Sequence, residues 1–349
     1  MKTTKLLRAA VTAVAIATLT ACGGGGSDPA PVVPVTPVVT IGNLLTTPQA
    51  SPYVAGSAEK RTFDEINRIR IGGGFGAAVH DATMDKAAAA HVDYWLANPI
   101  KKGHEQIPGN PGFTGVWPWD RCTAAAVGES SALASLGFLT CSENGTMSDY
   151  SRAELHVMGS YALATGHLQN ALDYRYNRTG MSFKHNPSGL DQWSKPGDDP
   201  TFGVMKVGYR SNAMAKLGSD KANSIVGVYP FDGMTGVGIG KATVIHGVSS
   251  LGYGLSILVQ SSLKANPTVT TFTLRKEGAT ADTPTRIHQA GTMDGTEPTI
   301  AGWGIMFPTV VLDVNSKYTV TFAGSVDGTP VSKTWSFTTG TTAESRLGG

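Results

Sequence analysis

Residues 164–183 read Ala-Thr-Gly-His-Leu-Gln-Asn-Ala-Leu-Asp-Tyr-Arg-Tyr-Asn-Arg-Thr-Gly-Met-Ser-Phe, and this stretch decides how the fold is interpreted. His167 follows a glycine at the expected entry of a helix. Leu168, Ala171 and Leu172 then recur at the three- and four-residue spacing of an apolar helix face. The closing Gly180-Met-Ser-Phe is typical of the start of a strand. We therefore expect a helix followed by a strand, with His167 at the beginning of the helix.

The residues before this stretch indicate two longer helices. Apolar residues recur at helical spacing between Phe63 and Ile69, and the glycines at 72–74 end that helix. Asp81 or Thr83 caps the second helix. Its apolar face consists of Met84, Ala87, Ala88, His91, Tyr94 and Trp95. Within this face we expect His91 to be a packed, hydrogen-bonded core histidine.

Shorter elements follow, and they complete a mixed architecture. Helices are expected over residues 119–126 and 150–163, and strands over residues 201–210 and 224–229. Helices with interspersed strands indicate an α+β layer structure, in which each element buries its apolar side against another layer.

The last third of the chain has a different pattern. Residues 268–274, 318–322 and 334–339 alternate apolar and polar side chains, which is typical of antiparallel strands in a β-sandwich. Together with the frame at 229–237, this region resembles a bacterial Ig-like domain. Such modules recur as spacers and adhesion units on surface proteins, so the resemblance implies an all-β sandwich over residues 224–342.

Five short motifs occur in one order between residues 60 and 210. They are Ile66-Asn67-Arg68-Ile69-Arg70, the helix segment 88–94, Gly112-Phe113-Thr114-Gly115 followed by Asp120-Arg121, Gly128-Glu129-Ser130, and the stretch 164–183. In this order they resemble the bacterial CAP superfamily, the SCP-like domain of cysteine-rich secretory, antigen 5 and pathogenesis-related proteins. The resemblance implies an α-β-α sandwich over residues 58–215.

The same resemblance implies a polar cleft lined by His104, Glu129 and His167. Two imidazoles and one carboxylate with an open fourth position match the ligand set of zinc or another divalent metal. Without a metal, a histidine–carboxylate pair supplies a general base. Two departures weaken the metal interpretation: Ala164 stands where some members have a second glutamate, and Ser130 replaces the asparagine of the family's Gly-Glu-Asn pattern.

Simpler interpretations of these residues remain open. His104 lies in a hydrophilic segment and fits an exposed loop residue as well. Glu129 fits a helix cap, because a carboxylate is stabilised by the free amides at a helix start near Ser130. Cys122 and Cys141 are expected to form a disulfide, which stabilises a loop of this size by about 3 kcal/mol; two free buried thiols are the alternative.

The N-terminus is interpreted as a processing and anchoring segment. Residues 1–21 combine a basic start with an apolar run too short to span a bilayer, and they end directly before Cys22. This spacing favours a lipoprotein signal in which Cys22 takes the lipid and anchors the protein to a membrane. An ordinary secretory signal is the alternative. Residues 22–57 are expected to form an unfolded Gly/Pro-rich linker, and Gly23 favours the outer membrane.

Composition excludes some functions and leaves others open. The net charge is only +2 and the chain has no large basic cluster, so we expect no nucleic-acid partner. His-Glu-x-x-His and Gly-x-Ser-x-Gly motifs are absent, and whether the protein is an enzyme stays open. The leading hypothesis is a cell-envelope protein whose cleft binds a small molecule, lipid, peptide or cell-wall ligand. The alternatives are a metal-assisted hydrolase of peptide or cell-wall material and an adhesion protein acting through the Ig-like domain.

Overall fold

The computed structural model describes residues 44–98, 103–149, 165–186, 200–212, 224–239, 255–262, 266–289 and 302–342. Two compact units are distinguished, residues 1–35 and 36–349, and all described residues belong to the second. Cys22 and the expected helix over 150–163 lie outside the described residues. None of the described helices has the length and apolar character needed to cross a membrane. The described residues form a mixed α/β structure with three four-stranded sheets.

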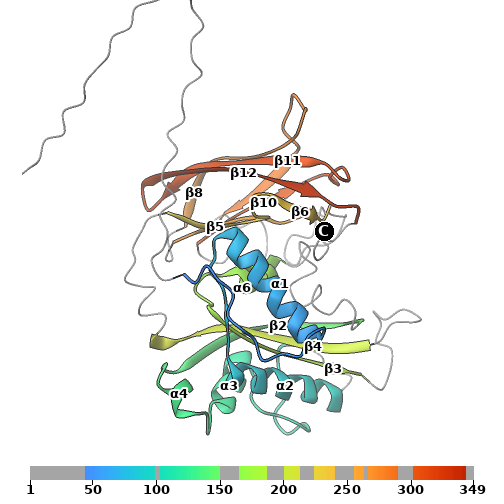
Figure 1. Cartoon of the computed structure of the whole chain (residues 1–349), viewed down its shortest axis with the longest axis vertical. Helices are drawn as coiled ribbons and strands as arrows, with labels where there is room; N and C mark the ends of the chain where they lie inside the picture. Colours follow the sequence, from blue (N-terminus) through green and yellow to red (C-terminus); the bar gives the residue numbers. More distant parts are fainter. Residues whose placement is uncertain are drawn as a thin grey trace, which may run out of the picture. The chain divides into compact units, whose positions relative to one another are not determined.

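The first sheet lies between two layers of helices (Figure 1). Its strands, in spatial order, are β1 (Val79–His80), β3 (Arg178–His185), β4 (Pro200–Arg210) and β2 (Leu139–Asp149). The helices on one face are α2 (Ala82–Ala97), α3 (Pro118–Ala125) and α4 (Ser131–Ala134), and those on the other are α1 (Ala58–Gly73) and α6 (Thr165–Leu172). All neighbours pair antiparallel except β1 and β3. This region has the α-β-α layering that the sequence predicts.

The two long helices begin and end where the sequence indicates. The Ser57 side chain caps α1 by accepting from the Lys60 amide, and α1 ends at Gly74, whose φ of 89° suits a residue without Cβ. Asp81 caps α2, because its carboxylate accepts from the Thr83 amide. The expected apolar face of α2 is buried against the first sheet, which confirms the periodicity argument.

Strand β2 was not expected from the sequence. It pairs with β4 along its whole length, from Leu139 opposite Arg210 to Asp149 opposite Pro200, and it is an edge strand of the first sheet. The sequence of β2 lacks the alternating apolar residues by which a strand is recognised. Its buried residues include the polar Glu143 and Asn144. These polar residues belong to the site described below.

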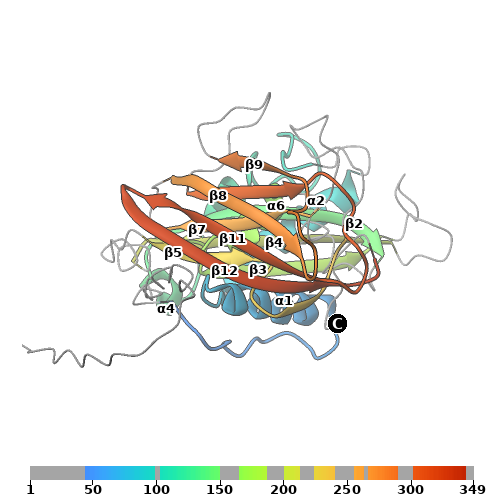
Figure 2. The ribbon, with the colours of Figure 1, turned by 90° about the horizontal axis from the view of Figure 1, so that it is seen from above.

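The second and third sheets pack face to face (Figure 2). The second sheet contains β5 (Ile225–Tyr229), β7 (Ile257–Ser261), β10 (Trp303–Pro308) and β9 (Thr285–Gln289). The third contains β6 (Met234–Val237), β12 (Thr329–Thr339), β11 (Lys317–Val326) and β8 (Pro267–Lys276). The predicted alternation is confirmed, since Phe272, Phe322 and Trp335 are buried while their strand neighbours are more exposed.

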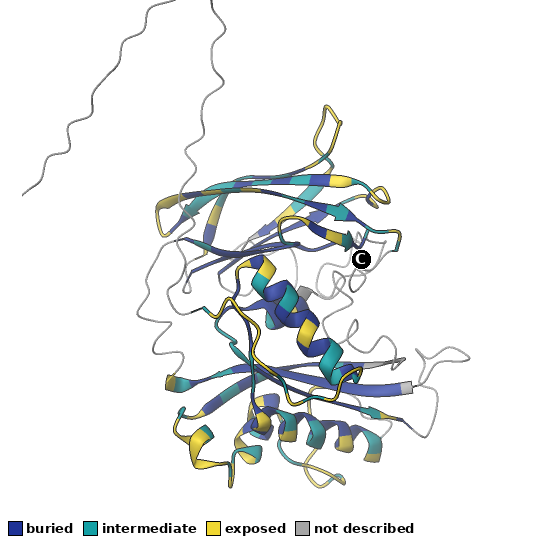
Figure 3. Cartoon of the chain, in the orientation of Figure 1, coloured by how far each residue is buried: buried dark blue, intermediate teal, exposed yellow. Residues whose placement is uncertain are grey.

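A continuous apolar core joins the helix layer of α1 and α6 to the second sheet (Figure 3). A Cβ built on Gly73 or Gly74 would come within 2.7 Å of a carbonyl oxygen of β5, so the end of α1 touches that strand directly. Phe75 packs on Trp303 with ring centroids 5.9 Å apart. The domain boundaries at 58–215 and 224–342 stay predictions, but the two regions share one core.

Residues 44–57 correct the expected extent of the linker. They lie against the folded region, where Leu44 packs at Gly76 and the Ala77 amide donates to Leu45 O at 2.7 Å. Tyr53 packs edge-on against Phe63 and donates to Asp85 at 2.6 Å. Leu44 and Tyr53 are isolated apolar groups in a stretch without periodicity, so the sequence pattern did not reveal this docking. Residues 22–43 lie outside the described residues.

Candidate functional site

Glu143 on β2 is a buried carboxylate surrounded by cationic and imidazole groups. Its Oε1 accepts from Arg121 Nη2 at 2.5 Å and from His104 Nδ1 at 3.0 Å. Its Oε2 accepts from the Lys206 ammonium. His91 Nε2 lies 3.3 Å from Oε1. Because Arg121, Lys206 and His91 are themselves buried, the carboxylate is fully enclosed by partners from α2, α3 and β4.

The charges in this cluster are mutually dependent. Burial alone raises the pKa of Glu143, but Lys206 and the hydrogen bond from His104 outweigh it and hold the pKa well below its usual range. Burial lowers the pKa of Lys206 to about 8, against the opposing attraction of Glu143. At neutral pH the carboxylate is ionised, and two cations face one anion. The cluster therefore carries a net positive charge next to His104.

This ionised carboxylate determines the tautomer of His104. A carboxylate only accepts hydrogen bonds, so Nδ1 of His104 must carry the proton that it donates to Glu143. In the neutral ring, Nε2 then keeps its lone pair. The His104 side chain is 49% exposed, so this nitrogen belongs to a solvent-accessible residue. His104 can act there as an acceptor, a ligand or a general base.

His91 is the packed core histidine that the sequence predicts. The Thr114 amide donates to Gln106 Oε1 at 2.8 Å, so the Gln106 NH₂ group faces His91 Nδ1, 2.9 Å away. Nδ1 is therefore the acceptor, and Nε2 donates to Gly103 O at 3.0 Å. Burial lowers the pKa of His91 to about 3 although Glu143 opposes it. His91 is neutral and positions its neighbours.

His167 lies in the first turn of α6, and its ring approaches that of His104. The two ring centroids are 6.2 Å apart and the ring planes cross at 77°. Asn144 donates to the His167 carbonyl at 2.8 Å and accepts from Asn170 at 3.2 Å. Neighbouring strand residues point to opposite faces, so Glu143 positions one histidine and Asn144 the other. The edge position of β2 is what allows a loop from one helix layer and α6 from the other to approach.

The structure does not bring Glu129 to this pair, which corrects the sequence-based cleft. Its carboxylate accepts from both Nη atoms of Arg210 at 2.9 Å and from Thr83 Oγ1 at 2.9 Å. Thr83 is eight residues before His91 on α2, about 12 Å along the helix axis. Hydrogen bonds from Arg210 lower the pKa of Glu129. The helix-cap alternative is not seen either, since Ser130 caps α4 with its own hydroxyl. Glu129 is an ion-pair partner of Arg210.

A comparison with family models finds a match in the part of the chain that forms the first sheet and its helices. Residues 63–203 match CAP, the cysteine-rich secretory protein family. The matched region includes His104, His167, Glu143 and the whole of β2. It ends within β4, so the second and third sheets lie beyond it. A comparison with curated proteins found no match.

Sequence reasoning missed Glu143, although a signal for it is present. The CAP pattern used above is Gly-Glu-Asn, and Gly128-Glu129-Ser130 lacks its asparagine. Ser142-Glu143-Asn144 lacks the glycine but keeps the Glu-Asn pair. The asparagine is the more informative residue here, because Asn144 holds the backbone of His167. If the asparagine of the Gly-Glu-Asn pattern counts for more than its glycine, the pattern selects Glu143 over Glu129.

The predicted disulfide between Cys122 and Cys141 is present. It joins α3 to β2. Cys122 follows Arg121 directly, and Cys141 lies two residues before Glu143. The bridge therefore fixes the two elements that supply the Arg121–Glu143 contact.

The donor set does not fit the zinc site that the sequence suggested. Among the described residues, no group of three or more histidine, cysteine, aspartate or glutamate side chains is arranged to hold a metal. His104 and His167 are close, but Glu129 is elsewhere. Glu143 is already balanced by Arg121 and Lys206, whose positive charges oppose a divalent cation. The pair offers two imidazoles where a catalytic zinc site takes three protein ligands.

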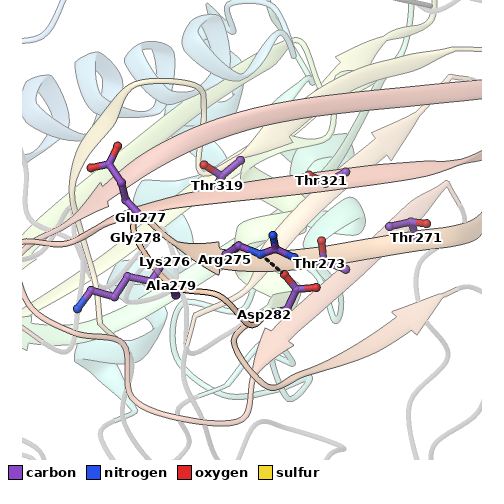
Figure 4. Close-up of a pocket in the computed structure, with 10 residues that line it drawn as sticks. All are labelled: Thr271, Thr273, Arg275, Lys276, Glu277, Gly278, Ala279, Asp282, Thr319 and Thr321. Carbon is purple, nitrogen blue, oxygen red and sulfur yellow. Dashed lines mark hydrogen bonds and ion pairs between the residues drawn. The ribbon is translucent and has the colours of Figure 1, made fainter. Parts of the chain in front are cut away.

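A separate pocket of about 550 Å³ lies on the outer face of the third sheet (Figure 4). It is lined by β8, β11 and the turn after β8. Thr273 and Thr321 are directly opposite each other in the strand register, and Arg275 pairs with Asp282 at 2.7 Å. The pocket is lined mainly by threonine and charged residues, and it belongs to strands distant in sequence from His104 and His167.

Proposed function

We propose that this protein is a cell-envelope lipoprotein whose CAP domain presents a polar histidine cleft for ligand binding. A CAP domain suggests extracellular ligand binding in general, and such domains are typically extracellular or secreted. The observation that carries the proposal is the approach of His104 and His167, with ring centroids 6.2 Å apart. The carboxylate that supports the cleft is Glu143 in place of Glu129.

The geometry suits a polar ligand. His104 donates its Nδ1 proton to Glu143 and offers Nε2 outward, while the net positive cluster beneath favours partial negative charge on the ligand. The backbones of both histidines are fixed, by Arg121 at His104 O and by Asn144 at His167 O. A cleft whose groups are already ordered loses little entropy when a ligand binds.

A binding test uses defined probes and a matched histidine control. Gly-Gly, palmitate and N-acetylmuramyl dipeptide are titrated against the full chain, with the ¹⁵N signals of the histidine side chains as the readout. We expect at least one probe to shift His104 and His167 while buried His91 stays unchanged. His104→Ala and His167→Ala should weaken binding about tenfold, and His185→Ala should not. If no probe shifts either cleft histidine, the proposal fails.

The proposed anchor is a lipid on Cys22, with residues 1–21 removed as a lipoprotein signal. Its support is the short apolar run that ends at Cys22. Labelling of growing cells with an alkyne fatty acid should mark the wild-type protein in the outer-membrane fraction. Cys22→Ser should remove the label and release the protein, whereas a soluble, unlabelled wild-type protein would support the ordinary secretory signal.

Hydrolysis of peptide or cell-wall material is the second candidate, and the His104–Glu143 pair favours it. A histidine held in one tautomer by a carboxylate is a suitable general base. In this form the reaction uses His104 to activate water and needs no ion held by the histidines. Cell-wall zymograms should then show activity that resists EDTA and disappears in His104→Ala but not in His185→Ala. Activity abolished by EDTA would restore the metal-assisted version.

Adhesion through an Ig-like sandwich is the third candidate, and the polar pocket on the third sheet favours it. The test belongs in the full chain, because the sandwich shares its core with the CAP domain. Thr321→Lys places a long side chain in the pocket, and Thr338→Lys is a control on the neighbouring strand. Loss of adhesion to host or abiotic surfaces in the first variant alone would support this candidate. Equal adhesion by the wild type and both lysine variants would exclude the pocket as the adhesion site.

A further inference from the structure

Two tryptophans at the start of α3 are exposed, and neither the histidine pair nor the apolar core includes them. Trp117 is 42% and Trp119 is 52% exposed. Their rings are stacked, with centroids 5.7 Å apart and an interplanar angle of 20°. Ile107 and Phe113 of the same loop are exposed as well. Exposed aromatic side chains gathered in one short segment mark an interaction site more often than scattered ones do.

The backbone that carries the pair is fixed before any ligand arrives. The Trp117 amide donates to Asp120 Oδ2 at 2.9 Å and starts α3, and Thr123 Oγ1 donates to the Trp119 carbonyl at 3.0 Å. Arg121 Nη1 donates to Val116 O at 3.0 Å. Pro118, between the tryptophans, is buried. Two large rigid rings on an ordered backbone form a preorganised platform.

We propose that Trp117 and Trp119 form a stacking platform for the sugar rings of a β-linked hexopyranose chain. The face of an indole ring carries negative charge density, and the axial C–H groups of a pyranose present a flat, weakly positive surface to it. Each ring covers only part of the other, so ring face remains accessible on the pair. Thr123 Oγ1 donates to the Trp119 carbonyl, so this hydroxyl lies beside the pair and its oxygen can still accept from a sugar hydroxyl.

The surrounding charge favours a neutral glycan over a membrane surface. Between residues 103 and 120 the chain has no lysine or arginine, but it has the carboxylates of Glu105 and Asp120. Loops and helices that insert into anionic membranes combine aromatic residues with basic ones. The Asp120 carboxylate, which accepts from the Trp117 amide, would be repelled by an anionic membrane, whereas sugar hydroxyls donate readily to carboxylates.

The platform and the histidine cleft belong to one loop assembly. The backbone N–H of Gln106 donates to Val116 O at 2.9 Å, and Arg121 Nη2 donates to His104 O at 2.9 Å. The backbone next to the tryptophans is therefore linked to the backbone of His104. The inference goes beyond the proposed cleft function and does not depend on it, because the rings bind by their own faces.

The test measures binding of chitotetraose and cellotetraose to the full chain by calorimetry and by tryptophan fluorescence. We expect saturable binding of at least one sugar, weakened about tenfold or more in Trp117→Ala and in Trp119→Ala. Trp117→Phe and Trp119→Phe should retain part of it. Phe138→Ala is the matched control, since Phe138 is an exposed aromatic residue directly before β2. Circular dichroism and the thermal midpoint show whether each variant is folded.

Several results would overturn the platform. These are wild-type protein that binds neither sugar, sugar binding that is unchanged in both alanine variants, and tryptophan-dependent binding to phosphatidylglycerol vesicles without sugar binding. His104→Ala separates the two proposals. Sugar binding that persists in this variant supports an independent platform, and sugar binding that depends on His104 but not on the tryptophans excludes the platform.

Discussion

The residue that organises the site is Glu143, because its carboxylate is the counter-charge of two buried cations and orients His104. Arg121 and Lys206 are buried cations that both donate to it, and His104 takes its orientation from it. A buried ion pair is costly to form, but removing one partner is costlier because the remaining charge is left without a counter-charge. The buried cluster is therefore a sensitive point for both stability and ligand binding.

Glu143→Gln tests this cluster. We expect the free energy of unfolding to fall by about 3–5 kcal/mol, because two buried cations lose their counter-charge. Urea denaturation measures the change. Glu105→Gln is the control, since Glu105 is exposed and adjacent to the same histidine, and its effect should stay within about 0.5 kcal/mol. Equal stability of the two variants would show that the cations find other partners.

The lowered pKa of His91 predicts that the free energy of unfolding decreases as the pH is lowered. Burial lowers its pKa from 6.5 to about 3 in the folded state, so between these values the unfolded chain binds the proton and the folded chain does not. Stability is therefore lost as the pH falls below 6.5, at up to about 1.4 kcal/mol per pH unit from this group. His91→Gln should flatten the profile between pH 6.5 and 4.5. Parallel profiles for the two proteins would contradict the assignment.

At the scale of elements, β2 connects the features of the site. One strand carries Glu143 for His104, Asn144 for His167 and Cys141 for the bridge to α3. Its position at the sheet edge brings the two helix layers together there. The disulfide closes the segment between α3 and β2, which includes Glu129 and its ion pair with Arg210.

Reduction of the disulfide should loosen this segment before the domain unfolds. We expect faster hydrogen exchange over residues 123–140 and a stability loss of about 3 kcal/mol from the opened loop. Exchange in β3, which lies on the far side of β4 from β2, is the internal control. Unchanged exchange over 123–140 would mean that the Arg210–Glu129 pair holds the segment without the bridge.

At the scale of the whole described unit, the sandwich of the second and third sheets covers a face of the α1 and α6 helix layer that would otherwise be exposed. The apolar core extends from α1 and α6 into the second sheet, and the Tyr174 amide donates across this contact to Gln260 Oε1 at 3.0 Å. Contacts of this kind make two sequence regions unfold together, because either one alone would expose apolar surface.

Trp303→Ala tests this coupling. Trp303 is fully buried in the second sheet and packs on Phe75, which follows α1 in the sequence. We expect one calorimetric transition in both proteins and a loss of about 3–5 kcal/mol in the variant. Hydrogen exchange should rise in α1 as well as in β10. Two separate transitions, with α1 unaffected, would establish independently stable halves.

The sequence alone determined the local elements, because periodicity, caps and glycine positions act over a few residues. The helix after His167, the Asp81 cap, the alternating strands of the third sheet and the Cys122–Cys141 pair all followed from such signals. Tertiary structure decided which carboxylate meets the histidines. Glu129 and Glu143 look alike in the sequence, but only the pairing of β2 with β4 buries Glu143 against Lys206 and leaves Glu129 to Arg210. Such pairing depends on contacts between residues dozens of positions apart, which no local pattern encodes.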